Sequence, residues 1–206
     1  MNPAAQPIRW GTAQASPLTR GLARLRGVLF GQPAPAPEHL PDLPVRLRRT
    51  AVAAPYLEAE AASDHRRAGA AAVEAAESAI QTQDWWVADS WAHRALWHFE
   101  QGSLALPAIR AARRIGDLRT MAGDPDSARP YYAEAISEAR DVGAQREEGL
   151  AELGLARAEL DRGEVTTARR LASVAIDNLA GGGAPASELE AARAVRGSEK
   201  AVNETH

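Results

Sequence analysis

The sequence predicts an all-α solenoid built from helix–turn–helix repeats, and three observations support this fold class. Hydrophobic residues make up 45% of the 206 residues but aromatic residues only 5%, because the apolar content is mostly alanine and leucine, which lose least on entering a helix. Small residues recur at an interval of forty. Each predicted turn pairs a helix-ending residue with an acidic one. The length favours one domain with a sizeable core plus a tail.

The interval of forty residues predicts paired helices. In the second and third repeats, a glycine in the left-handed conformation should close the first helix, and the acidic residue after it should start the second; Gln83 replaces this glycine in the first repeat. The turns are Gln83-Asp84, Gly123-Asp124 and Gly163-Glu164, and the recurring small residues include Ala88, Ala128 and Ala168, then Ala95, Ala135 and Ala175. Repeats are expected at about 69–99, 109–139 and 149–179, within a domain spanning 45–197.

The second repeat resembles the tetratricopeptide repeat (TPR) family. Ile115-Gly116, Gly123-Asp124, Ala128, Tyr132 and Ala135 match the family's large–small pair, turn and Ala–aromatic–Ala pattern. An interval of forty exceeds the family's usual length of about 34 residues, and is similar to that of long repeats in bacterial regulators and adaptors. The resemblance implies a right-handed α-solenoid. HEAT and armadillo arrays also have long repeats but lack this turn.

The resemblance also implies a partner-binding groove on the face formed by the first helix of each repeat. The family's register places eight residues there: Val73, Glu77, Arg110, Arg113, Asp117, Leu153, Arg157 and Leu160. Three arginines with two carboxylates would suit a peptide that carries a carboxylate or mixed charges. The alternative is that Arg113 pairs with Asp117, four residues later, and only solubilises the surface.

The N-terminal region differs from the repeats in charge and composition. Residues 1 to 50 carry seven arginines and two carboxylates, a net charge of +5, which leaves −8 for the remainder. Residues 1–44 are expected to be flexible, with a basic amphipathic helix at 18–30 and a proline-rich linker at 32–44. Three roles stay open for that helix: packing on the domain, docking a partner, or contact with a membrane surface.

Both borders of the repeats are expected to be helical. A helix at 45–62 is either kinked or divided by Pro55. A helix at 187–197 should cap the array, because Arg196 replaces the small residue that the repeats carry at the equivalent position. Residues 198–206 are expected to be disordered.

The search for chemistry favours a non-enzymatic protein. There is no cysteine, no glycine-rich loop after a strand pattern, and no recognisable nucleophile, so no catalytic residue and no cofactor are expected. His93 and His98 do not share a helix face, which argues against a metal site. Basic residues are too dispersed for direct nucleic-acid binding. Without a signal peptide or spanning segment, a cytoplasmic location is expected.

The tryptophan-rich helix at about 85–99 has two faces. Trp85, Ala88, Ala92, Ala95, Leu96 and Phe99 share the side that should pack within the repeat, while Trp86, His93 and Trp97 point the other way. Either the helix at 45–62 or that at 18–30 covers this second face, or it is an interface. The sequence thus predicts an adaptor or scaffold binding a peptide or protein; the alternative is a homodimeric regulator or sensor of a peptide or small ligand.

Overall fold

The computed structural model describes residues 44, 47 and 53–198, all within the unit Leu43–His206. The helices that the described residues form are α3 (Ala53–Ala61), α4 (His65–Gln81), α5 (Trp85–Gln101), α6 (Ala105–Met121), α7 (Pro125–Asp141), α8 (Gln145–Asp161), α9 (Val165–Gly181) and α10 (Ala186–Gly197). No described residue forms a strand, so the all-α class is confirmed. Expectations for 1–43 and 199–206, including the helix at 18–30, lie outside the described residues.

A turn of one geometry recurs every twenty residues. Each turn contains one residue with positive φ, at Ser63, Gln83, Ser103, Gly123, Gly143, Gly163 and Gly183. The expected left-handed glycines are therefore confirmed at Gly123 and Gly163, both at φ 80°. Each helix from α4 to α9 has 17 residues, and two such helices with their turns give the interval of forty read from the sequence.

Aspartates start three of the helices. The side chains of Asp64, Asp84 and Asp124 accept hydrogen bonds from the backbone N–H groups three residues later, at 3.0, 3.3 and 3.1 Å. Each such bond satisfies an amide that the helix leaves without an internal partner. Glu164, the acidic residue of the third turn, makes no such bond.

The array extends by one helix beyond the three repeats at each end. The repeats are α4–α5, α6–α7 and α8–α9, a few residues longer at each end than the sequence indicated. Helix α3 occupies the place of a second helix and α10 that of a first one. Pro55 is the third residue of α3 as it is described, and the part of the expected helix at 45–62 that precedes Ala53 lies outside the described residues apart from Leu47. Arg196 is exposed, as expected at a capping helix.

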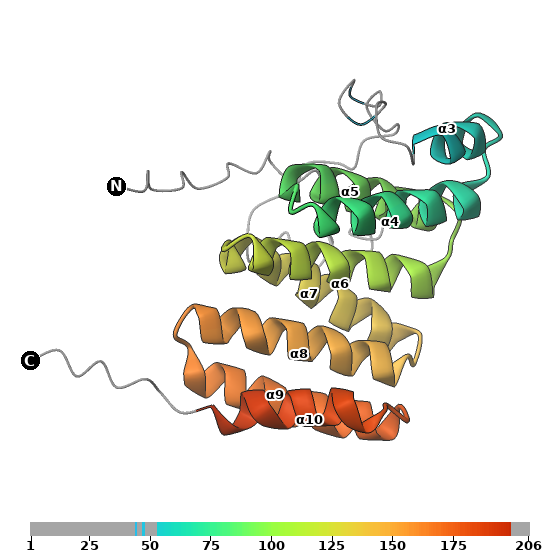
Figure 1. Cartoon of the computed structure of the whole chain (residues 1–206). Helices are drawn as coiled ribbons and strands as arrows, with labels where there is room; N and C mark the ends of the chain where they lie inside the picture. The colour runs from blue at the N-terminus through green and yellow to red at the C-terminus, as the bar shows by residue number, and fades with distance from the viewer. Residues whose placement is uncertain (1–43, 45–46, 48–52, 199–206) are drawn as a thin grey trace, which may run out of the picture. The chain divides into compact units, whose positions relative to one another are not determined.

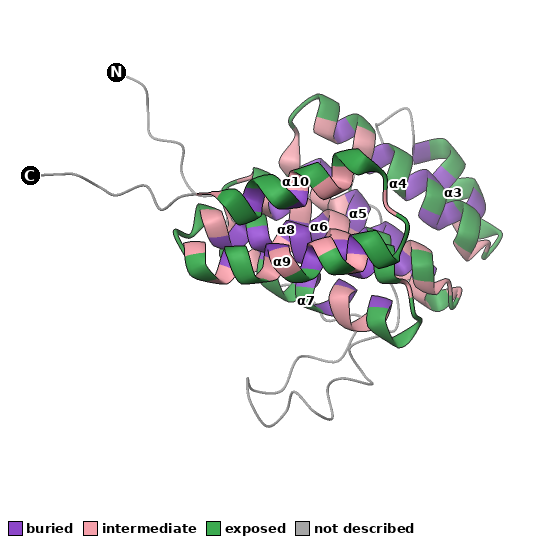
Figure 2. Ribbon diagram, turned by 90° about the horizontal axis from the view of Figure 1, so that it is seen from below, coloured by how far each residue is buried: buried purple, intermediate pink, exposed green. Residues whose placement is uncertain are grey.

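Successive helices stack against one another (Figure 1), and α6 also contacts α8 as α8 contacts α10. Buried residues lie where helices face each other (Figure 2). The close packing expected at Gly116 is confirmed, because a Cβ atom there would lie 2.8 Å from Cε1 of Tyr132. Gly154 of α8 meets the same ring, so Tyr132 is held between two glycines. None of the described helices has the length and apolarity needed to cross a membrane.

Ion pairs link consecutive repeats, and the acidic and basic partners exchange places from one junction to the next. Asp89 of α5 pairs with Arg119 of α6 at 3.3 Å, and the positions forty residues later hold Arg129 and Glu159, which pair at 2.8 Å. The acidic partner thus lies on the second helix at the first junction and on the following first helix at the next. The side chains of Asp89, Arg119 and Glu159 are at least 86% buried, whereas that of Arg129 is 50% exposed, so the first pair is shielded from water and the second is shielded only on its acidic side.

Candidate functional site

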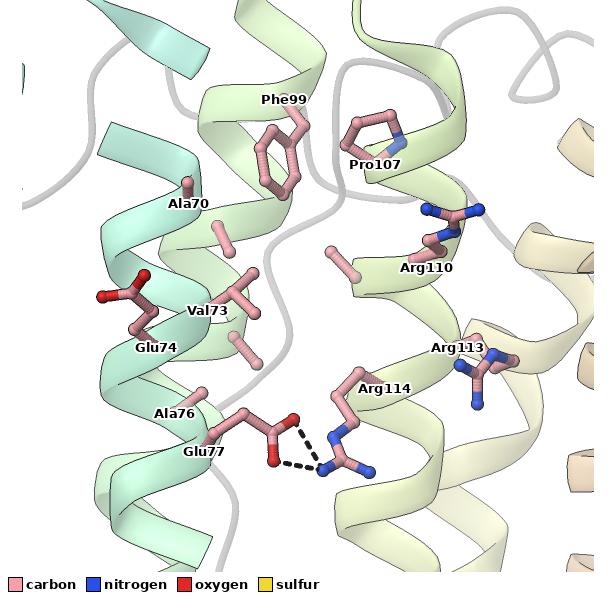
Figure 3. A pocket seen from close by; sticks show the side chains of 13 residues that line it. Ala70, Val73, Glu74, Ala76, Glu77, Phe99, Pro107, Arg110, Arg113 and Arg114 are labelled. Atoms are coloured by element: carbon pink, nitrogen blue, oxygen red, sulfur yellow. Dashed lines mark hydrogen bonds and ion pairs between the residues drawn. The ribbon is translucent and has the colours of Figure 1, made fainter. Parts of the chain in front are cut away.

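A cleft of about 610 Å³ opens between α4 and α6, with α5 as its floor. This volume lies within the range of about 300 to 1,000 Å³ that is usual for ligand sites. The wall residues from α4 include Val73 and Glu77, the floor includes Phe99, and the α6 wall includes Pro107 and Arg110 (Figure 3). The first-helix face of the array is therefore hollowed at the junction of the first two repeats.

Comparing positions forty residues apart explains why the cleft lies at this junction. Between α6 and α8, Nε of Arg110 donates to Oε1 of Glu147 at 2.7 Å, so two long side chains bridge the helices. The equivalent positions between α4 and α6 hold Ala70 and Pro107. Neither side chain can span the distance, and the space that an ion pair fills elsewhere is left open.

The interior of the cleft is apolar. Val73 is 37% exposed and points into the gap, which Phe99 also lines (Figure 3). Phe99 is only 6% exposed, and it packs over Gly69, where a Cβ atom would lie 2.6 Å from Cδ1 of the ring. An apolar side chain entering the cleft would therefore meet a rigid, mostly preformed surface.

Ion pairs border the cleft. Nη2 of Arg114 donates to both carboxylate oxygens of Glu77 at 2.6 Å and closes one end (Figure 3). Nη1 of Arg113 donates to Oδ2 of Asp117 at 2.9 Å. The pairing of Arg113 with Asp117, considered from the sequence as the alternative to ligand binding, is thus present. It uses one nitrogen of a guanidinium group that has five N–H donors.

Four of the eight predicted groove residues are brought together in the cleft: Val73, Glu77, Arg110 and Arg113. Asp117 lies beside them and accepts a hydrogen bond from the Tyr132 hydroxyl at 2.9 Å. Burial, followed by the charge of Asp117, raises the pKa of that phenol, so Tyr132 stays protonated. Asp117 therefore fixes Arg113 and Tyr132 as well as bordering the site.

The groove prediction fails in part for the third repeat. Leu153 was expected to line the groove but is 4% exposed and belongs to a core cluster with Ala192 and Val195 of α10. The capping helix covers this side of α8, which a register taken from a single repeat does not reveal. Leu160 is partly buried against the same cluster, and Arg157 is exposed. None of these three lines the cleft.

The second face of α5 is not an open aromatic patch. Nε2 of His93 lies 3.0 Å from the Tyr131 hydroxyl of α7, and the ring of Trp97 packs edge-on against His65 and His98. Trp86, by contrast, is 41% exposed. The three residues proposed as one interface thus have different surroundings, and Tyr56 of α3 packs against Trp91 and His98.

A buried polar cluster joins α3, α4 and α5, and sequence reasoning missed it. The Tyr56 hydroxyl donates to Oε1 of Glu60 at 2.7 Å, accepts from Nη1 of Arg94 at 3.2 Å, and lies 3.0 Å from Nε2 of His98. Because the phenol proton is used by Glu60, Nε2 of His98 is the donor to Tyr56. Nδ1 of His98 then accepts from Nδ1 of His65, 3.1 Å away.

This geometry keeps His98 neutral. Burial, followed by the positive charges of His65 and Arg94, lowers the pKa of His98 to about 4. The phenol of Tyr56, fully buried against Trp91 at a ring-centroid distance of 5.0 Å, is the main large side chain that α3 inserts. In the sequence, the sign of this cluster is Tyr56, a single aromatic residue among the alanines of α3.

The described residues contain no group of three or more His, Asp or Glu side chains placed to hold a metal ion. No protein-family model, curated protein or solved structure matches the chain. The class of protein is therefore defined by the fold: it is an all-α repeat solenoid. One feature of this solenoid suited to holding a ligand is the apolar cleft with a charged border.

Proposed function

We propose that this protein is a TPR-like, non-enzymatic scaffold of the cytoplasm that binds a peptide segment of a partner protein in the cleft between α4 and α6. The observation that supports the proposal is a cleft with an apolar interior, Val73 and Phe99, bordered by Arg110 and Arg113. This combination of an apolar centre and a few polar groups at the edge is typical of ligand sites.

The energetics favour a segment that inserts an apolar side chain. Covering one such side chain contributes about 1.5 to 3 kcal/mol, equivalent to roughly 10- to 100-fold in affinity. The walls are helices of 17 residues each, so little ordering of the protein is needed on binding. Guanidinium donors at the edge would add orientation more than affinity.

Selection of peptides from a random display library on the full-length protein would test the proposal. Two exposed valines offer matched variants: Val73 in the cleft, 37% exposed, and Val174 on α9, 39% exposed. Selected peptides should bind the Val174→Arg variant as they bind the wild type and bind Val73→Arg at least about 10-fold more weakly. Failure to enrich any peptide, or equal binding to both variants, would reject this site.

A homodimeric regulator is the second candidate, and the exposed ring of Trp86 favours it. Light scattering after size-exclusion chromatography would decide between the two. A dimer that becomes monomeric on Trp86→Ala substitution would support the regulator, and a wild-type monomer at micromolar concentration would remove it.

A further inference from the structure

We propose that the cleft takes a partner segment in which an apolar anchor is flanked by a basic residue over α4 and an acidic residue over α6. This ligand chemistry rests on the proposed function, and it adds a charge order to the peptide. It follows from three parts of the site: the missing bridge between the helices, the carboxylate on one border, and the guanidinium groups on the other.

The anchor should be apolar because the interior of the cleft lacks hydrogen-bonding side chains. The repeat positions that hold Arg110 and Glu147 at the next junction hold Ala70 and Pro107 here. Together with Val73 and Phe99 these side chains offer no hydrogen-bond partner. A polar side chain inserted among them would lose its hydration without replacement, whereas a branched or aromatic apolar side chain would fill the space.

The α4 border is negative. Glu74 is exposed and makes no ion pair among the described residues. Its stem lines the cleft while its carboxylate points to the side of α4 away from α6 (Figure 3). A segment that crosses α4 on its way to the cleft would pass this carboxylate, and a basic residue there would be its complement.

The guanidinium groups on the α6 border are each paired with a carboxylate but still have N–H donors to offer. Arg110 is 57% exposed at the side chain and uses only Nε in its bond to Glu147. Arg113 uses only Nη1 towards Asp117, and its Nε is buried without an acceptor among the described residues. The remaining N–H groups of both side chains suit a carboxylate of the ligand.

The closed end of the cleft adds little to the choice of charge. Glu77 and Arg114 bind one another through both carboxylate oxygens, whereas Arg110 and Arg113 each use a single nitrogen in their ion pairs. Discrimination between ligands therefore falls to Glu74 on one border and to Arg110 and Arg113 on the other.

Charge reversal at Glu74 tests the inference. Random twelve-residue display peptides would be selected on the full-length wild-type protein, and their affinities measured for Glu74→Lys and for Glu190→Lys, which makes the same charge change at an exposed position of α10. Binders should share an apolar anchor with opposite charges on its two sides. Glu74→Lys should weaken them about 5-fold, replacing their basic residue by Glu should restore binding, and Glu190→Lys should have no effect.

Three results would overturn the inference. One is binders without the charge pattern, and another is equal loss on Glu74→Lys and Glu190→Lys; either would leave peptide binding in the cleft intact. The third is displacement of the selected peptides by a synthetic peptide of residues 18–30, with that peptide losing affinity on Val73→Arg substitution. That result would make the occupant a segment of this chain instead of a partner. If no peptide is selected at all, the proposed function fails instead.

Discussion

Acidification should weaken the array through the buried imidazole of His98. In the neutral ring, Nε2 donates to Tyr56 and Nδ1 accepts from His65 at 3.1 Å. A proton can join the folded protein at His98 only on Nδ1, which would place a second N–H group opposite that of His65. The charge would also lie near Arg94, and the carboxylate of Glu60 already accepts from Tyr56 and lies 4.0 Å from Arg94.

The magnitude follows from the pKa of His98, which burial lowers from 6.5 to about 4. Between these values the unfolded chain holds a proton that the folded chain does not. The free energy of unfolding therefore rises with pH across this window and falls on acidification. The full difference corresponds to about 3 kcal/mol, a large part of the roughly 5 to 15 kcal/mol that stabilises a domain.

Urea denaturation followed by circular dichroism at pH 7 and about pH 4.5 would measure this loss. The comparison requires His98→Gln, because glutamine keeps a donor for Tyr56 but does not titrate. Burial raises the pKa values of Glu138 and Glu152, so those carboxyls take up protons more readily in the folded than in the unfolded chain and oppose the loss on acidification. Both carboxyls are present in His98→Gln, so comparing the two proteins removes their contribution. Between pH 7 and about pH 4.5, the free energy of unfolding of the wild type should fall by about 2.5 kcal/mol more than that of His98→Gln.

The structure also indicates which helix should unfold first on acidification. Helix α3 has nine residues and buries Ala53, Tyr56 and Ala59, of which only Tyr56 is large. Amide hydrogen exchange in α3 should therefore accelerate on acidification before exchange in α6 to α9. Equal pH dependence of unfolding in the wild type and His98→Gln would refute the assignment of the effect to this imidazole.

Three further predictions concern local packing. Ser103, with φ 53°, should gain about 0.5 to 1 kcal/mol on replacement by glycine, and a lower urea midpoint would contradict this. Gly154→Ala should cost about 1 to 3 kcal/mol because an aromatic ring occupies the space, whereas Gly197→Ala, which meets nothing within 4 Å, should not. Trp97→Ala should lower stability by about 2 to 3 kcal/mol, because the ring packs edge-on against His65 and His98; an unchanged midpoint of thermal unfolding would contradict this.

The repeat and its turns could be predicted from the sequence because their causes are local. A glycine that closes a helix and an aspartate that starts the next lie side by side in the chain, as at Gly123-Asp124. Burial of Leu153, in contrast, depends on α10, some forty residues later, and a register taken from one repeat contains no information about that cover.

The cleft and the histidine cluster required the three-dimensional structure for different reasons. The cleft results from side chains that are too short, and it becomes visible in the sequence only when Ala70 and Pro107 are compared with the residues forty positions later. The cluster joins Tyr56 and His98, which are 42 residues apart. Their meeting depends on how α3 is rotated about its axis, and composition alone does not determine that rotation.

The alternating ion pairs at the repeat junctions determine the order of the units. A deletion of forty residues from Leu104 to Gly143 would preserve the spacing of the turns and join α5 to α8. It would also place the carboxylate of Asp89 opposite that of Glu159, where Arg119 and Arg129 now neutralise them. Like charges in a poorly hydrated site repel, so the new junction should be weaker than the two original ones, with only Arg162 and His93 left among the described residues to pair with Glu159 and Asp89. Repeats of equal length are thus not interchangeable. The charges at each junction are complementary only when the repeats stand in their present order.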